Sequence, residues 1–161
     1  MLVTHLQLKN DGTLWATGYN GDGSYGIGDT TSRSSLIQVG SGYATISCCN
    51  YGLSYNANLA IKTDGTLWAT GYNSFGQLGD GTTTQRSTRV QIGSLTNWAN
   101  ISTGLQIIAI KTDGSIWGWG YNASGELGLG DQISRSSPTR IGLLNTWEAV
   151  AACKFFSLGI K

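Results

Sequence analysis

The chain contains short stretches in which apolar and polar residues alternate, a spacing that places the apolar side chains on one face of a β-strand. In residues 4–9, Leu6 and Leu8 alternate with polar residues, and residues 13–18 continue the pattern after the turn sequence Asn10-Asp11-Gly12. Asp-Gly between two such stretches is a strong short-range signal for a β-hairpin. We therefore expect two antiparallel strands joined by a type I′ turn, with positive φ at both central residues.

Two more strands complete this unit. Residues 36–40 form the third predicted strand, which matches residues 88–93 and 138–142, and residues 44–49 form the fourth. Pro138 fits the entrance of its strand, where a missing N–H costs little. No helical periodicity interrupts these stretches. The pattern predicts an all-β chain of short antiparallel strands.

The unit is repeated three times. Its signature occupies residues 11–20, returns unchanged at residues 64–73, and returns at residues 113–122 as DGSIWGWGYN. The step between copies is about 50 residues. Self-similarity at such a step is typical of solenoids, propellers or repeat arrays.

The repeat extends well beyond this signature. Each signature is followed by three glycines at fixed spacing, then by an arginine, by Val-Gly or Ile-Gly, and by a segment that begins with an aromatic residue. The three copies of the glycine segment are Gly23–Gly28, Gly76–Gly81 and Gly125–Gly130, the arginines are Arg33, Arg86 and Arg135, and the aromatic segments are Tyr43–Ile46, Trp98–Ile101 and Trp147–Val150.

This combined pattern resembles the repeat of the regulator of chromosome condensation family, and it covers nearly the whole chain. The resemblance implies a β-propeller, which in that family usually has seven four-stranded blades. Family members often have a histidine at the start of the strand before Asp-Gly, whereas this chain has Thr4, Ala57 and Gln106 there; its only histidine, His5, lies one residue later. The near-identical copies are most similar to the bacterial and bacteriophage branch.

The fold class predicted is all-β, with propeller blades made of three four-stranded antiparallel repeats plus one extra strand. We expect one repeat domain over residues 1–161. Its repeats span about residues 4–56, 57–105 and 106–154, and residues 155–161 form a further copy of the leading strand without a partner.

Three blades leave an open arc, because propellers close with about four to eight blades. Three solutions remain open: the chain is part of a longer repeat protein, two copies close one ring as a homodimer, or a different protein caps the arc. In a homodimer, the segment Phe155–Lys161 would cross to the partner as a clasp, with its apolar residues Phe155, Phe156, Leu158 and Ile160.

Composition narrows the classes of function. Ten Lys and Arg residues balance nine Asp and Glu residues along the chain, so there is no basic stripe of the kind that nucleic-acid binding requires. No apolar run approaches the roughly 18 residues that a membrane span needs, so we expect no membrane insertion. The three cysteines are expected to be free thiols, and neither metal-ligand spacing nor a cofactor motif is present.

Catalytic chemistry is not indicated. His5 lies at an outward strand position, and no nucleophile, base and orienting group recur together. The G-x-G-x-x-G match at Gly21, Gly23 and Gly26 is not followed by a helix, which dinucleotide binding requires. We therefore expect a protein that is not an enzyme.

The best candidate for a contact site is the loop that breaks the repeat. The first copy has extra residues after its fourth strand, and loops are common places for grafted function. The contact residues that we predict in this loop are Asn50, Tyr51, Leu53, Tyr55 and Asn56. If the propeller is an enzyme inhibitor, Tyr19, Tyr72, Tyr121 and Phe75 would supply its aromatic anchors on one ring face, although a tyrosine in every copy favours a structural role.

These observations favour a non-catalytic propeller that serves as a binding or structural module, with a protein or a glycan as partner. Loops rich in Ser, Thr, Asn and Gly favour a virion component (tail, fibre or decoration) or a cell surface over the cytoplasm. The alternative is a regulatory protein-binding propeller, either an enzyme inhibitor or a guanine-nucleotide exchange factor. The tryptophan column Trp15, Trp68 and Trp117 is expected to pack between blades, with a sugar-binding platform as the other interpretation.

Overall fold

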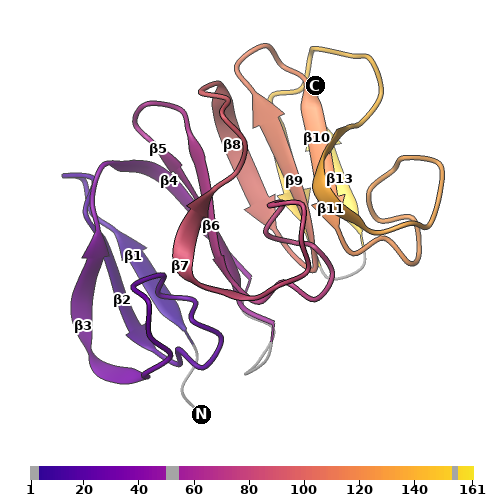
Figure 1. Cartoon of the computed structure of the whole chain (residues 1–161). Coiled ribbons are helices and arrows are strands. Elements are labelled where there is room, and N and C mark those ends of the chain that lie inside the picture. Colours follow the sequence, from indigo (N-terminus) through magenta and orange to yellow (C-terminus); the bar gives the residue numbers. More distant parts are fainter. Residues whose placement is uncertain (1–3, 50–54, 154–155) are drawn as a thin grey trace.

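The computed structural model describes residues 4–49, 55–153 and 156–161 and contains thirteen strands in these ranges, in four antiparallel sheets. Figure 1 shows the sheets side by side in chain order, like successive blades. Sheet 1 contains β1 (His5–Leu8), β2 (Leu14–Gly18) and β3 (Arg33–Gly40). Sheet 2 contains β4 (Tyr43–Cys48), β5 (Ala57–Lys62), β6 (Leu67–Gly71) and β7 (Arg86–Gln91). Sheet 3 contains β8 (Trp98–Thr103), β9 (Gln106–Lys111), β10 (Ile116–Gly120) and β11 (Arg135–Arg140), and sheet 4 contains β12 (Ala149–Ala152) and β13 (Ser157–Ile160).

The all-β fold and the three four-strand repeats plus one strand are confirmed, but the sheets are offset from the repeats by one strand. The last strand of each repeat pairs with the first strand of the next: β4 pairs with β5, β8 with β9 and β12 with β13. The expectation that the terminal strand has no partner is therefore wrong, because Ala149 lies opposite Ile160 in an antiparallel ladder.

The Asp-Gly turns also differ from the prediction. In the first hairpin only Gly12 has a positive φ, at 76°. Among the described residues, every residue with a positive φ is a glycine. Gly12 N–H donates to the Lys9 carbonyl at 2.9 Å, and Lys9 N–H donates to the Thr13 carbonyl at 2.9 Å. This is a three-residue loop with a glycine bulge, so the predicted type I′ turn is wrong.

Local hydrogen bonds explain why the Asp-Gly-Thr-Leu-Trp signature is repeated. In the second copy, the Asp64 carboxylate accepts hydrogen bonds from the main-chain N–H and the hydroxyl of Thr66, at 3.0 and 2.6 Å. The same hydroxyl accepts the indole N–H of Trp68 at 2.9 Å. The first and third copies form the same relay. The motif thus fixes the turn and the orientation of its tryptophan together.

Three apolar clusters lie between the four sheets. Leu14 and Tyr25 belong to the cluster between sheets 1 and 2, Leu59 and Trp119 to that between sheets 2 and 3, and Ile108 to that between sheets 3 and 4. Of the tryptophan column, Trp117 packs against the second cluster, as predicted, whereas Trp15 and Trp68 belong to none of the three clusters. Each sheet therefore buries its apolar residues only against its neighbours in the row, as repeat architectures do.

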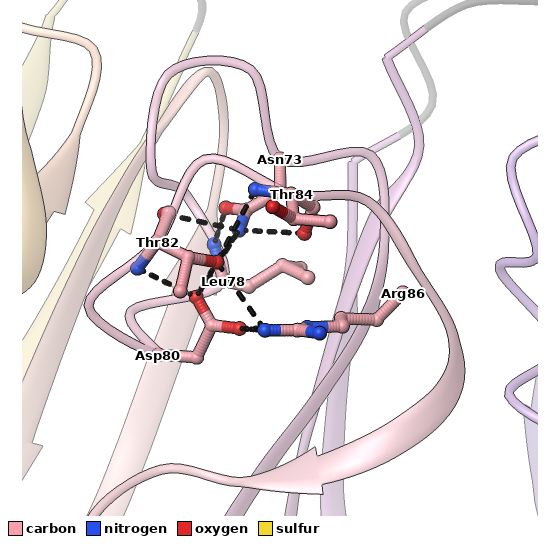
Figure 2. Close-up of polar contacts among 6 residues, drawn as sticks. All are labelled: Asn73, Leu78, Asp80, Thr82, Thr84 and Arg86. Carbon is pink, nitrogen blue, oxygen red and sulfur yellow. Dashed lines mark hydrogen bonds and ion pairs between the residues drawn. The ribbon is translucent and has the colours of Figure 1, made fainter.

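The long loop between the second and third strand of each repeat is held together by the asparagine of Gly-Tyr-Asn. Figure 2 shows the loop of sheet 2, where the Asn73 amide donates to the carbonyls of Thr82 and Thr84, at 3.1 and 3.0 Å, and its oxygen accepts Leu78 N–H at 2.9 Å. The Asp80 carboxylate accepts from Thr82 and from the Arg86 guanidinium, whose Nε lies 2.8 Å away. Asn20 and Asn122 play the same role in their copies.

Among the described residues no helix is long and apolar enough to cross a membrane.

Candidate functional site: an aromatic row across sheets 2 and 3

Four aromatic side chains form a continuous row of ring contacts, which we call the aromatic row: Tyr55, Tyr72, Phe75 and Tyr121. The ring centres of Tyr55 and Tyr72 are 5.0 Å apart, those of Tyr72 and Phe75 are 6.2 Å apart, and those of Phe75 and Tyr121 are 5.0 Å apart. All three contacts are edge-to-face, the arrangement that the charge distribution of aromatic rings favours. The row links sheet 2 to sheet 3.

Local structure places these rings at one end of the strands. Tyr55 precedes β5, Tyr72 follows β6 and Tyr121 follows β10, so all three lie at the end opposite to the Asp-Gly hairpins. Main-chain bonds secure the positions, because Tyr72 N–H donates to the Asn56 carbonyl and Tyr121 N–H donates to that of Leu105, at 3.1 and 3.2 Å.

Phe75 supplies the link between the two repeats. It stands in the loop after β6, where its main-chain N–H donates to the buried side-chain oxygen of Gln77 at 2.9 Å. Alignment on the glycine segments places Asp22 and Ser124 at the same position in the other copies, so this ring occurs in one copy only. The row is therefore a feature of the boundary between sheets 2 and 3, and it is not repeated at each blade.

The row presents carbon surface to solvent. Tyr55 is 39% exposed, and the other three rings are half-buried. Half-buried aromatic rings that are held by one another lose little conformational freedom on binding, which suits them as anchors in protein contacts. The arrangement is fit for binding.

The residues of the predicted contact loop differ in what the structure shows of them. Asn50, Tyr51 and Leu53 lie outside the described residues. Tyr55 is exposed and joins the aromatic row. Asn56 is fully buried, so its predicted surface contact is wrong.

Asn56 instead joins two sheets. Its side-chain amide donates to the Asp22 carboxylate at 3.2 Å, across the boundary between sheet 1 and sheet 2. Burial raises the pKa of Asp22, and the hydrogen bonds from Asn56 oppose that rise. The base of the loop is therefore anchored in the interior, directly beside the exposed ring of Tyr55.

The tyrosine of the first copy does not join the row. Tyr19 folds over Gly21, where a Cβ atom would collide with the phenol ring. The sequence showed the same Gly-Tyr-Asn in all three copies, so it gave no sign of this difference.

The predicted clasp lies at the other end of the row of sheets. Phe156, Leu158 and Ile160 are 52%, 62% and 65% exposed, while Phe155 lies outside the described residues. The exposed side chains of β13 face away from sheet 3, on the side where a further blade would pack. Their role as an oligomer clasp stays a prediction.

Comparison with known protein families identifies the repeat. The model of the regulator of chromosome condensation (RCC1) repeat matches residues 64–110 and 113–160, more than half of the chain, and a second model of this repeat matches residues 37–77. The chain belongs to the RCC1 repeat family.

Solved structures support the same fold. Human WBSCR16 has a TM-score of 0.76 at 19% identity over 94% of this chain, and Prp20p from Saccharomyces cerevisiae has a TM-score of 0.79 at 18% identity over 96% of it. A chain in the crystal structure of Kap60 bound to yeast RCC1 (Prp20) has a TM-score of 0.79 at 18% identity over 99%. At these identities the similarity concerns the fold. The chain spans about two fifths of the length of these three structures, 41%, 40% and 41% respectively.

Proposed function

We propose that this chain is a non-catalytic propeller segment that binds a partner protein through the aromatic row. The observation that carries the proposal is the unbroken series of ring contacts from Tyr55 to Tyr121, at one end of two neighbouring blades. Rings that stand in a repeat only for structural reasons would recur in each copy, whereas Phe75 occurs once.

A protein partner is favoured over a glycan. Sugar platforms present the flat face of a ring, whereas the edge-to-face contacts here turn each ring towards its neighbour. The similar Prp20p is described with binding properties to Gsp1p and histones, and yeast RCC1 (Prp20) is described bound to Kap60. Propellers of this repeat thus include protein binders, which supports the same class of function for this chain.

The finer assignments belong to the same proposal. A virion or cell-surface position, and membership of the bacterial and bacteriophage branch, rest on the near-identical copies and on loops rich in Ser, Thr, Asn and Gly. The alternative, a regulatory propeller that inhibits an enzyme or exchanges nucleotides on a GTPase, uses the same aromatic surface with a different partner.

The experiment compares proteins retained from an extract of the source by immobilised wild-type chain and by two variants. Phe75→Ala with Tyr121→Ala removes the centre and one end of the row. Ser74→Glu adds a charge at an exposed position beside Phe75 and leaves every ring in place. Both variants are expected to lose at least 90% of a specifically retained protein, since each disrupts the apolar surface.

Tyr19→Ala is the matched control, because it removes the equivalent tyrosine outside the row. It is expected to retain the partner, and far-ultraviolet circular dichroism checks that each variant is folded. Equal retention of the same protein by wild type and by both row variants would refute the proposal. Binding of the wild type to a glycan array, lost in the row variants, would replace the protein partner with a sugar.

A further inference from the structure

The two grooves between the first three sheets are built from equivalent residues but are filled differently. We call the groove between sheets 1 and 2 the first interblade groove, and that between sheets 2 and 3 the second interblade groove. Both lie at the end of the strands that carries the Asp-Gly hairpins, opposite to the aromatic row.

Arg89 of β7 fills the first interblade groove. Its guanidinium donates a hydrogen bond to the main-chain oxygen of Val39 at 2.8 Å, and its central carbon lies 5.4 Å from the centre of the Tyr43 ring. A Cβ atom on Gly26 would collide with the Arg89 side chain, so that glycine leaves the space which the arginine takes. Burial lowers the pKa of Arg89, consistent with a cation enclosed by the two sheets.

The second interblade groove has no such side chain. Strands β7 and β11 begin at the equivalent residues Arg86 and Arg135. Arg89 and Pro138 each lie three residues after that start, so they are equivalent as well. The short proline ring cannot reach across to sheet 2. A groove of about 390 Å³ is open at this place, and Pro138 is part of its wall.

Each group that contacts Arg89 has a counterpart in the wall of this open groove. The main-chain oxygen of Val39 corresponds to that of Ile92, the ring of Tyr43 to Trp98, and Gly26 to Gly79. Within the described parts of the chain, no group donates a hydrogen bond to the Ile92 oxygen. Tryptophan is also the best of the aromatic residues for holding a cation.

A lysine beside the groove does not prevent a guanidinium from binding. In the second interblade groove, Lys111 is part of the wall, and its ammonium lies 3.5 Å from the ring centre of Trp117 and 4.8 Å from that of Trp98. In the first, the equivalent Lys62 lies 4.2 Å from the ring centre of Trp68 and 5.9 Å from that of Tyr43, and Arg89 shares the Tyr43 ring with it. In both grooves the negative face of an indole ring attracts the lysine ammonium, so a lysine and a guanidinium can stand beside the same pair of rings.

The wall of the second interblade groove includes a carboxylate, which is ion-paired with Arg86 at 2.8 Å. The Asp80 carboxylate is in its wall, at the position that Ile27 takes in the first copy. Hydrogen bonds from Arg86 and Thr82 hold that carboxylate in place. A carboxylate at this place is an acceptor that suits the N–H groups of a guanidinium.

We propose that the second interblade groove binds an arginine side chain of a partner protein, in the place that Arg89 takes in the first. This contact is separate from the aromatic row, since the two surfaces lie at opposite ends of β9 and β10. The groove can therefore bind arginine even if the row is not a contact surface, and the converse also holds.

The test is a nuclear magnetic resonance titration of the whole chain with a blocked arginine, Nα-acetyl-arginine methylamide. The chain has six tryptophans, whose indole N–H signals serve as separate reporters. We expect the Trp98 and Trp117 signals to shift in a saturable way, with a dissociation constant on the order of 1 mM because a single side chain makes few contacts. The Trp68 signal, beside the filled groove, is expected to stay in place.

Two matched arginine variants locate the site. Pro138→Arg copies the first interblade groove, and it is expected to weaken binding of the probe at least about tenfold. Gln132→Arg adds the same charge at an exposed place outside the groove, and it is expected to bind like the wild type. Arg89→Ala is expected to open the first interblade groove, so that the Trp68 signal responds to the probe as well.

The controls for chemistry are blocked citrulline, which is a neutral isostere of arginine, and blocked glutamate. Both are expected to cause no saturable shift up to about 20 mM, since neither carries the cation that the indole rings attract. The proposal is overturned if blocked citrulline binds as tightly as blocked arginine, if Pro138→Arg binds like the wild type, or if arginine moves no groove signal.

Discussion

The same strand of the repeat is interior in the middle sheets and exposed in the outer ones. Leu59 of β5 and Leu158 of β13 occupy equivalent positions, yet their side chains are 1% and 62% exposed. Ile61 and Ile160 differ in the same way, at 3% and 65%. In β5 each face is covered by an adjacent sheet, whereas β13 has an adjacent sheet on one face only. Whether an apolar side chain of this strand is buried therefore depends on the presence of a neighbouring blade.

The largest expected effect separates the two leucines. Leu59→Ala leaves a cavity in the cluster between sheets 2 and 3, so the free energy of unfolding should fall by about 2–5 kcal/mol. Leu158→Ala removes an exposed side chain, and it should change that free energy by about 0.5 kcal/mol or less. Urea unfolding curves measure both. Similar losses at the two positions would show that a further surface covers β13 in solution.

The hairpin glycines provide the second pair. Gly65 in sheet 2 and Gly12 in sheet 1 both have positive φ, at 79° and 76°. A Cβ at Gly65 would collide with the main-chain oxygen of Thr96, whereas at Gly12 the nearest atom is the Tyr43 oxygen at 3.3 Å. Gly12→Ala should therefore cost about 1–2 kcal/mol from the backbone conformation, and Gly65→Ala more than about 2 kcal/mol. Thermal unfolding measures which variant loses more stability. A larger loss for Gly12→Ala than for Gly65→Ala would contradict the prediction.

The third prediction concerns the loop clamps and their dependence on pH. The side chain of Asp80 is 8% exposed, against 39% for Asp29 in sheet 1. Burial alone would raise the pKa of Asp80, but hydrogen bonds from Thr82 and Arg86 outweigh it and leave the pKa below its ordinary value. Asp80→Asn should lower the free energy of unfolding at pH 7 by about 1–3 kcal/mol, and Asp29→Asn by less.

The sign of the pH effect follows from the lowered pKa. A carboxyl group whose pKa is lower in the folded state stabilises the fold above its unfolded pKa of about 3.9, and this contribution is lost as pH falls through the folded value. The difference between wild type and Asp80→Asn should therefore shrink below about pH 4. A difference that stays constant from pH 7 to pH 3 would contradict a charged clamp.

The smallest expected effect is local. The buried amide of Gln106 in β9 donates to the main-chain oxygens of Cys153 and Phe156, at 2.6 and 2.9 Å, and so ties the residues beside β12 and β13 to sheet 3. Gln106→Ala should speed hydrogen exchange in β12 and β13 by about tenfold, with little change in β5. Exchange that rises equally in β5 would show that the two outer strands do not open as a separate unit.

Much of the fold could be predicted because the repeat encodes its own local structure. The Asp-Gly turns, the strand alternation and the hydrogen-bonded relay from Asp64 to Trp68 involve residues close together in sequence. The pairing of β4 with β5 in place of β3 could not be predicted this way, since alternation shows which face of a strand is apolar but not which strand lies at its edge. The type I′ turn failed for a related reason, because an added bulge residue leaves the flanking pattern unchanged.

The candidate site was predictable only in part. Tyr55 stood out because its loop breaks the repeat, whereas Phe75 was named only as one of several aromatic anchors. The burial of Asn56 depends on Asp22 of the preceding sheet, and the departure of Tyr19 depends on how its ring folds over Gly21. The open groove had one sequence signal, the exchange of Arg89 for Pro138, which acquires meaning only when two sheets face each other.

By itself, the sequence determined the repeat, its strands, the positions of its turns and membership of the RCC1 family, because these follow from residues within one repeat. The tertiary structure alone decided which strands share a sheet, which equivalent side chains are buried, and where rings or an arginine from one blade meet the next. The physical reason is that each blade supplies only half of every interface, so identical residues acquire different surroundings according to their neighbours.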